Sequence, residues 1–110
     1  MAKSTVIDAV NFLEQRLMEK GLDISRIILF GSQAEGKATD ESDVDALIIS
    51  EDFQGKDVFE RAEMTKYAEI ATIKKFLIPF DIITLTPGEF ESGSSIIAEY
   101  AKTGEAIYGL

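Results

Sequence analysis

The sequence predicts an α/β protein of the α+β kind, a small mixed β-sheet with helices packed on it. Three short apolar runs are typical of strands, and two longer segments repeat apolar residues at helical spacing. From these segments we expect the order helix, strand, turn, strand, helix, strand, helix. The length of 110 residues suits one domain, which we expect to cover residues 1–110.

The first half of the chain is expected to contain one helix and two strands. The helix ends at Gly21, and its buried stripe consists of Val6, Val10, Leu13 and Leu17. Arg26–Phe30 is short, branched and apolar, as in a buried strand, and it stops at Gly31-Ser32. A turn of small and polar residues leads to a second strand, Asp43–Ser50. Because this connection is short, we expect the two strands to be antiparallel.

The second half is expected to return to the sheet through a long helix. Asp57–Phe76 carries apolar residues near helical spacing, namely Phe59, Ala62, Tyr67, Ile70, Ile73 and Leu77. Pro79–Thr86 predicts a third strand, parallel to the second because a strand–helix–strand unit forms a crossover. Thr86-Pro87-Gly88-Glu89 is typical of a helix capping box. We expect a last helix over Ser95–Lys102 and a short strand over Glu105–Tyr108.

The composition excludes several kinds of chemistry. The chain has no His and no Cys, which rules out a Ser-His-Asp triad, a thiolate nucleophile and imidazole or thiolate metal ligands. A net charge of −9 argues against duplex nucleic acid as a partner, because such binding depends on basic side chains. The sequence shows neither a signal peptide nor a membrane span, so we expect a cytoplasmic protein without a membrane partner.

Three aspartates fall at the starts of two predicted strands. Asp43 and Asp45 are two residues apart, so a strand projects both from one face. Asp81 lies near the start of the third strand, beside the pair if the two strands are parallel neighbours. Three clustered carboxylates repel one another unless a cation joins them. Oxygen ligands without His or Cys favour Mg²⁺ or Mn²⁺, and two such ions serve phosphoryl transfer.

The turn after the first strand supplies the complementary half of such a site. Gly31 permits close approach of the backbone to a ligand, and backbone N–H groups of such a turn favour phosphate oxygens. The hydroxyl of Ser32 adds a further donor. Metal ligands beside a phosphate cradle indicate transfer from a nucleoside triphosphate.

These residues resemble a known family. Gly31-Ser32, ten further residues and Asp43-Val44-Asp45 match the signature of the DNA-polymerase-β-like nucleotidyltransferases. The chain is similar to their minimal members over nearly its whole length, through Phe30, Gly31, Ser32, Ala34, Gly36, Ser42, Asp43 and Asp45, with Asp81 as the third acid.

The resemblance implies a nucleotidyltransferase fold and an activity. Asp43, Asp45 and Asp81 are then the catalytic acids and hold two Mg²⁺ ions, with Mn²⁺ as the alternative metal. Gly31 and Ser32 bind the nucleotide, ATP, whose AMP group passes to a hydroxyl of a protein. Many minimal members are antitoxins encoded beside a HEPN-domain toxin, which implies such a partner and a hetero-oligomer.

One departure keeps alternatives open. Family members often have Arg at the positions of Gln33 and Glu35, and the remaining candidate cations for a triphosphate are Lys37, Arg61 and Lys66. The alternatives are a catalytically weak module that neutralises a HEPN toxin by contact, or a transferase for a small molecule. The sequence does not distinguish them, nor does it give the acceptor, the preferred base or the oligomeric state.

Overall fold

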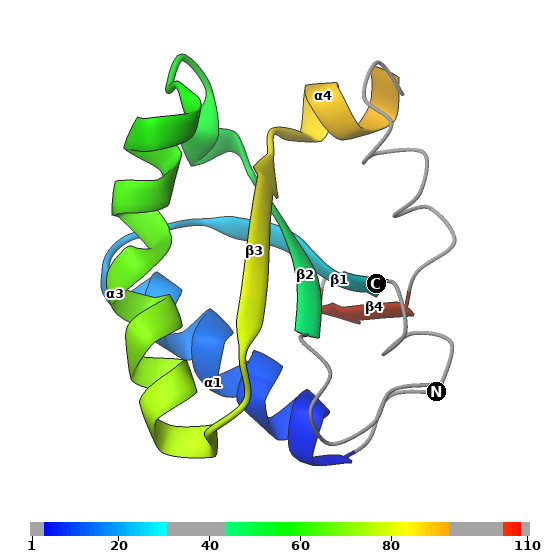
Figure 1. Ribbon diagram of the computed structural model, residues 1–110. Helices are drawn as coiled ribbons and strands as arrows, with labels where there is room; N and C mark the ends of the chain where they lie inside the picture. Colours follow the sequence, from blue (N-terminus) through cyan, green and yellow to red (C-terminus); the bar gives the residue numbers. More distant parts are fainter. Residues whose placement is uncertain (1–3, 31–43, 93–104, 109–110) are drawn as a thin grey trace.

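The structure is a computed structural model that describes residues 4–30, 44–92 and 105–108. Its elements in chain order are α1 (Ser4–Glu19), β1 (Ile24–Phe30), β2 (Val44–Ser50), the 3-10 helix η1 (Glu51–Phe53), α3 (Val58–Phe76), β3 (Phe80–Leu85), α4 (Pro87–Ser92) and β4 (Glu105–Tyr108) (Figure 1). The predicted strands and the two long helices are confirmed. The helix expected over Ser95–Lys102 lies outside the described residues.

The described strands form one mixed sheet in the order β3-β2-β1-β4. β1 pairs with β2 in the antiparallel sense, and β2 pairs with β3 in the parallel sense. β4 joins β1 on its other side, again antiparallel. The predicted fold class and both predicted strand pairings are therefore confirmed.

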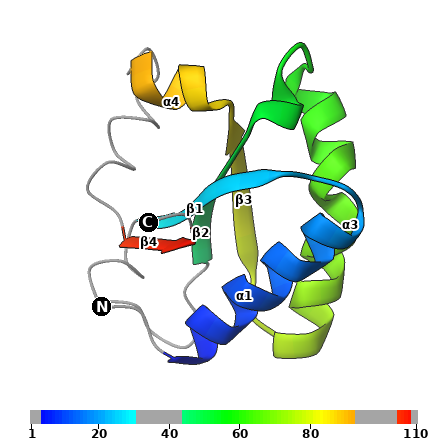
Figure 2. The same ribbon diagram turned by 180° about the vertical axis from the view of Figure 1, so that it is seen from behind.

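The two faces of the sheet are covered differently. α1 and α3 lie on one face, where Val44, Ala46 and Ile48 of β2 join the larger core cluster. On the other face, Leu47 and Ile49 form a smaller cluster with Ile28 of β1 and Phe90 of α4. Figures 1 and 2 show the two long helices on one side of the strands and α4 on the other. Side chains of β2 thus alternate between two differently covered faces.

The first helix matches its prediction. All four predicted stripe residues are buried, and they meet β1 and β2 in the larger cluster. Gly21 has a φ of +89°, and its N–H donates to the carbonyl of Met18 while the N–H of Leu22 donates to the carbonyl of Leu17. This pair of bonds is a Schellman motif, in which glycine tolerates the left-handed conformation. The helix therefore ends where the chain turns into β1.

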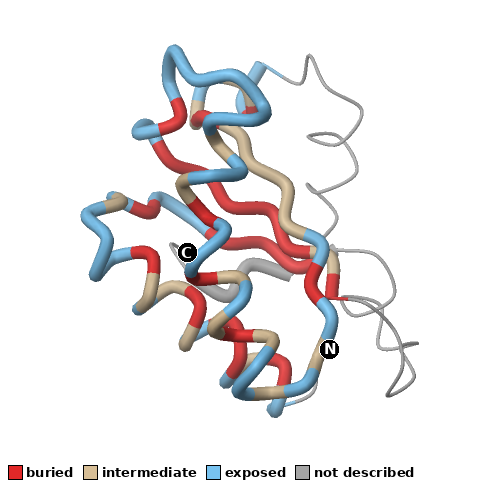
Figure 3. The backbone as a smooth tube through the Cα atoms, turned by 60° about the vertical axis from the view of Figure 1, so that its left-hand side comes forward, coloured by how far each residue is buried: buried red, intermediate tan, exposed pale blue. Residues whose placement is uncertain are grey.

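The predicted apolar stripe of α3 was wrong. Its buried residues are Thr65, Ala68 and Thr72, with Met64, Ile73 and Phe76 packed against the larger cluster. Of the predicted stripe, only Ile73 packs against that cluster, and the most exposed members are Phe59 and Leu77. Figure 3 shows buried positions on one side of the helices and exposed positions on the other.

Small residues explain why α3 turns this face inward. Thr65, Ala68 and Thr72 allow the helix to approach the sheet and α1 closely. Buried hydroxyls need partners, and Thr72 donates to the carbonyl of Ala68 at 2.7 Å while Thr65 bonds the carbonyls one turn earlier. Both sides of α3 carry apolar residues at helical spacing, so periodicity alone selected the wrong one.

The capping box before α4 is confirmed and linked to α3. The N–H of Glu89 donates to the hydroxyl of Thr86, and the N–H of Thr86 donates to the carboxylate of Glu89 at 2.8 Å. The guanidinium of Arg61 also donates to this carboxylate at 2.8 Å and to the carbonyl of Thr84 at 3.4 Å. Arg61 is a largely buried side chain, 13% exposed. One ion pair thus ties the start of α3 to the end of β3 and to α4.

These donors lower the pKa of the Glu89 carboxyl, first through the hydrogen bond from Arg61 and then through the N–H of Thr86. A carboxyl whose pKa is lower in the folded state contributes stability above its unfolded pKa, near 4.3. That contribution is lost as the pH falls through the lowered folded pKa. The Arg61–Glu89 pair therefore stabilises the fold at neutral pH and not in acid.

We predict that Glu89→Gln lowers the free energy of unfolding by about 1 kcal/mol at pH 7, because charged hydrogen bonds are lost at a partly exposed site. Urea denaturation measured from neutral to acid pH should show the difference from the wild type shrinking to zero. Glu91→Gln, an exposed change on the same helix, serves as the control. If Glu89→Gln still has a lower free energy of unfolding than the wild type in acid, the stabilisation does not come from the ionised Glu89 carboxylate.

Candidate functional site

Two of the three predicted acids are brought side by side by the sheet. Asp45 of β2 and Asp81 of β3 are direct register partners in the parallel pair. The N–H of Val44 donates to the carbonyl of Pro79 at 2.8 Å, which fixes the start of this pairing. Neighbouring strands are about 4.8 Å apart, so the carboxylates of Asp45 and Asp81 can contact the same ligand.

Both aspartates project from the same face of the sheet. Asp45 belongs to the set of β2 residues that includes Leu47 and Ile49, and Asp81 belongs with Ile83 and Leu85 of β3. That face is opposite to the one covered by α1 and α3. Asp45 is half-buried and Asp81 is exposed. The two carboxylates therefore lie at the edge of the less covered face, where a ligand can reach them.

The remaining predicted site residues are Asp43, Gly31 and Ser32, and all three lie outside the described residues. Phe30, the last residue of β1, directly precedes Gly31 in the sequence. Phe30 is the register partner of Asp45 on the side opposite to Asp81. The end of β1 and the starts of β2 and β3 therefore meet at one edge, as the sequence predicted. The metal and nucleotide roles of the five residues remain predictions.

Glu69 is an acid near this edge that the sequence analysis missed. It lies on α3, half-buried, and lines a cavity of about 230 Å³ with Ile82 and Ile83 of β3. Burial raises the pKa of its carboxyl, and the negative charge of Asp81 raises that pKa further. The packing of α3 against β3 brings Glu69 within electrostatic reach of Asp81. No spacing in the sequence predicts this proximity between distant segments.

The candidate cations of the sequence do not gather at this edge in the described part of the chain. Arg61 is held by Glu89 and by the carbonyl of Thr84, at the far end of β3. Lys66 is exposed on α3, and Lys37 lies outside the described residues. The expectation that Arg61 binds the triphosphate is therefore corrected. Arg61 lies at the end of β3 away from Asp81, where its role is structural.

The chemistry of this edge fits a divalent cation. Asp45 and Asp81 offer carboxylate oxygens, the ligands that Mg²⁺ and Mn²⁺ prefer. No lysine or arginine in the described residues forms an ion pair with Asp81. Within the described ranges no cluster of three metal-ligating side chains is found, and Asp43, the third candidate ligand, lies outside them.

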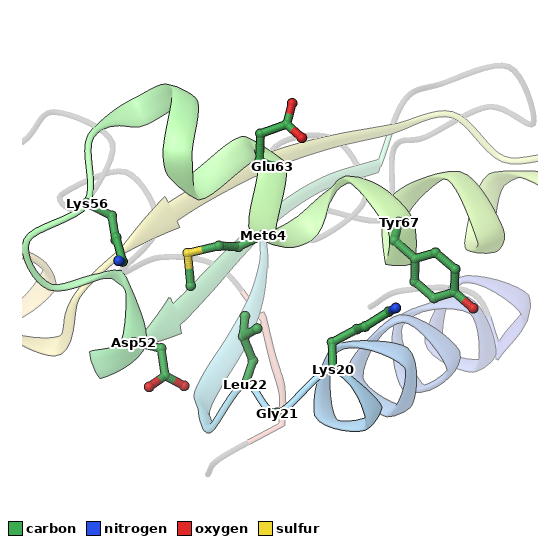
Figure 4. A pocket seen from close by; sticks show the side chains of 8 residues that line it. All are labelled: Lys20, Gly21, Leu22, Asp52, Lys56, Glu63, Met64 and Tyr67. Atoms are coloured by element: carbon green, nitrogen blue, oxygen red, sulfur yellow. The ribbon is translucent and has the colours of Figure 1, made fainter.

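A separate cavity of about 570 Å³ lies between the end of α1, η1 and α3 (Figure 4). Leu22 and Met64 point into it, while Glu63 points away from the other labelled side chains. The ammonium of Lys20 lies 4.3 Å from the centre of the Tyr67 ring at its margin. Of the described site residues, neither Asp45 nor Asp81 lines this cavity, which places it apart from these two carboxylates.

Comparisons with known proteins agree with the geometry. Residues 10–103 match a family model described as a nucleotidyltransferase domain. No curated protein matches the chain. In the described part of the chain, no helix combines the length and apolar character needed to cross a bilayer.

Solved structures share the fold at low sequence identity. A protein provisionally described as a minimal nucleotidyltransferase is 23% identical with a TM-score of 0.60, and the match covers 96% of this chain and 94% of that one. A protein provisionally described as a nucleotidyltransferase, from Sulfolobus solfataricus, is 23% identical with a TM-score of 0.53, over 84% and 82% of the two chains. A toxin–antitoxin structure with AMP-PNP is 19% identical with a TM-score of 0.61, over 89% and 72%.

We predict that Asp81→Asn lowers the pKa of Glu69, because it removes the nearby negative charge. Since burial is the larger cause, the pKa should stay above its usual value. Carbon-13 NMR titration of the Glu69 carboxyl measures both effects. Glu63→Gln, a change elsewhere on α3, should leave the titration unaltered. An unchanged Glu69 pKa in Asp81→Asn would show that the two carboxyls do not interact electrostatically.

Proposed function

Because the chain belongs to the nucleotidyltransferase domain family, we propose that it transfers AMP from ATP to a hydroxyl of a protein. The observation that carries the proposal is the in-register pair Asp45 and Asp81 on the less covered face of the sheet. Asp43, two residues before Asp45, completes the proposed set of metal ligands. Two Mg²⁺ ions are the proposed metals, with Mn²⁺ as a substitute.

The proposed reaction is an in-line displacement at the α-phosphorus. A bond forms between the acceptor oxygen and this phosphorus, the bond to the oxygen bridging to the β-phosphate breaks, and pyrophosphate leaves. Bound divalent metal would neutralise charge on the phosphate oxygens. We propose that Asp81, which is exposed at this edge, accepts the proton of the acceptor hydroxyl. Gly31 and Ser32 are proposed to hold the triphosphate.

The proposed partner is a HEPN-domain toxin, for which this chain acts as antitoxin in a hetero-oligomer. Structures named as toxin–antitoxin complexes, one with AMP-PNP and one a mutant named MntA-HpeT, share the fold. A cytoplasmic location and a single domain over residues 1–110 complete the proposal.

A second function is favoured by one specific observation. Gln33 and Glu35 stand where related proteins often have Arg, which leaves fewer cations for a triphosphate. A protein of this kind would neutralise the toxin by contact alone, its net charge of −9 suiting a basic partner surface. A protein that does not transfer AMP but still neutralises the toxin would have this second function and not the enzymatic one.

We predict that Asp45→Asn and Asp81→Asn each reduce AMP transfer by on the order of 100-fold or more, because each removes a metal ligand. The assay mixes the protein, Mg-ATP and a HEPN-domain protein of the proposed partner class, and intact mass detects an AMP adduct on that protein. Thermal unfolding should show both variants folded.

Asp8→Asn, an exposed change on α1, is the matched control and should transfer AMP at the wild-type rate. Unchanged transfer in both site variants would reject Asp45 and Asp81 as catalytic residues. A toxin fully neutralised by both variants, with no adduct formed by the wild type, would establish the contact module instead.

A further inference from the structure

β3 lies at the edge of the described sheet. In the strand order β3-β2-β1-β4 it pairs with β2 alone, and α3 runs alongside it (Figure 1). The outer side of an edge strand presents backbone N–H and C=O groups that another extended chain can bind. The groups that β3 turns outward therefore decide what can bind there.

Every second residue of β3 turns its backbone groups toward β2. The N–H of Val44 donates to the carbonyl of Pro79 at 2.8 Å, which fixes the phase of this alternation. In a parallel pair, the N–H and C=O of one residue face the same neighbouring strand. Asp81 and Ile83, which follow Pro79 at steps of two, therefore bond β2. The residues that alternate with them face the outer side of the sheet.

Ile82 and Thr84 are two of these outward-facing residues. The carbonyl of Thr84 accepts a hydrogen bond from Arg61 of α3 at 3.4 Å, as the alternation requires. In the described part of the chain, the N–H of Thr84 and both backbone groups of Ile82 have no hydrogen-bond partner. These groups are spaced along β3 as the backbone of an added strand would require.

A cavity of about 230 Å³ lies at this outer side, and we call it the edge groove. From β3 it is lined by three consecutive residues, Ile82, Ile83 and Thr84. Because consecutive side chains of a strand point to opposite faces, a space that touches all three lies beside the strand and not over one face. From α3 it is lined by residues at helical spacing, namely Val58, Ala62, Thr65 and Glu69. The edge groove therefore has the position that a further strand of the sheet would take.

The two ends of the edge groove differ in chemistry. Val58 and Ala62 give it an apolar end, and Val58 is 70% exposed. Glu69 lies at the other end, within electrostatic reach of Asp81. No Lys or Arg is among the described residues that line the groove. A segment that fits it therefore carries a Lys or Arg for Glu69 and, two residues away on the same face, an apolar side chain.

A second copy of β3 does not supply such a segment. Phe80–Leu85 contains one charged residue, Asp81, and neither Lys nor Arg, so it offers no cation to Glu69. A basic segment also complements the net charge of −9 on this chain. The charges therefore favour a different protein as the occupant of the edge groove.

We propose that the edge groove binds an extended segment of a partner protein, which adds to the sheet as a strand beside β3. The backbone of the segment bonds Ile82 and Thr84. Its Lys or Arg pairs with Glu69, and its apolar side chain contacts Val58. This binding needs neither metal nor nucleotide, so it is measured separately from AMP transfer. If the proposed function also holds, the bound segment passes Asp81 and can carry the acceptor hydroxyl to it.

A synthetic seven-residue peptide is the probe, with valine, lysine and valine at its second, fourth and sixth positions and threonine at the others. Nitrogen-15 NMR of the full chain, without metal or nucleotide, follows the amides of β3 as the peptide is added. We expect the N–H groups of Ile82 and Thr84 to shift and to exchange more slowly with solvent when the peptide binds. Those of Asp81 and Ile83 should change less, because they already bond β2.

Methylation of the peptide nitrogens tests whether the peptide binds as a strand. An added strand turns every second N–H toward its neighbour, so the peptide has two alternate sets of N–H groups. N-methylation of one set should abolish binding, and N-methylation of the other set should leave it unchanged.

Reversal of the charge in the groove tests the side-chain contact. Glu69→Lys should weaken binding of the lysine peptide by about 10-fold or more, and it should bind a peptide with glutamate in place of lysine better than the wild type does. Glu69→Gln, a smaller change to the fold, should weaken the lysine peptide by a smaller factor. Glu63→Lys, an exposed change on α3 outside the groove, is the control and should bind like the wild type.

Four results would overturn the proposal. The first is the absence of any shift in β3 at millimolar peptide, and the second is an equal loss of binding from both N-methylated sets. The third is unchanged binding of the lysine peptide by Glu69→Lys and Glu69→Gln. The fourth is slow exchange of the Ile82 and Thr84 N–H groups before peptide is added, because the edge would then already be occupied.

Discussion

The parallel pairing of β2 with β3 fixes where the acidic side chains of this protein lie. It places Asp45 directly opposite Asp81, and the alternation of side chains puts both on the face away from α1 and α3. A slip of one residue would turn Asp81 toward the helices and bring Phe80 or Ile82 to the open face. The buried Val44, Ala46 and Ile48 prevent such a slip, because their partners in the core accept only this register.

Bringing two carboxylates side by side has an electrostatic cost. Carboxylates about 4 Å apart repel by roughly 4 kcal/mol at an effective dielectric of 20. Burial first, and then the negative charge of Asp81, raises the pKa of the Glu69 carboxyl. Arg61 does not offset this negative charge, because its guanidinium pairs with Glu89 at the other end of β3. A divalent ion bound between the two carboxylates would offset their repulsion, which is why this edge suits the proposed chemistry.

Much of this arrangement could be predicted from the sequence. Short runs of branched apolar residues predicted the strands, and capping residues predicted α4. The pairing of Asp45 with Asp81 could be predicted because a parallel crossover aligns the starts of the two strands. The orientation of α3 could not be predicted, because threonines and alanine pack on the sheet while Phe59 and Leu77 remain outside. The position of Glu69 beside β3 and the binding of Arg61 to the end of β3 were missed for the same reason, since both depend on contacts between distant segments.

A crystal soaked in Mn²⁺ and a non-hydrolysable ATP analogue tests the central claim most directly, because the anomalous signal of manganese locates the metal without reference to activity. The account predicts an anomalous manganese peak next to the carboxylates of Asp45 and Asp81, with the triphosphate beside the end of β1. A metal bound elsewhere, or a nucleotide that binds away from this edge, would contradict it.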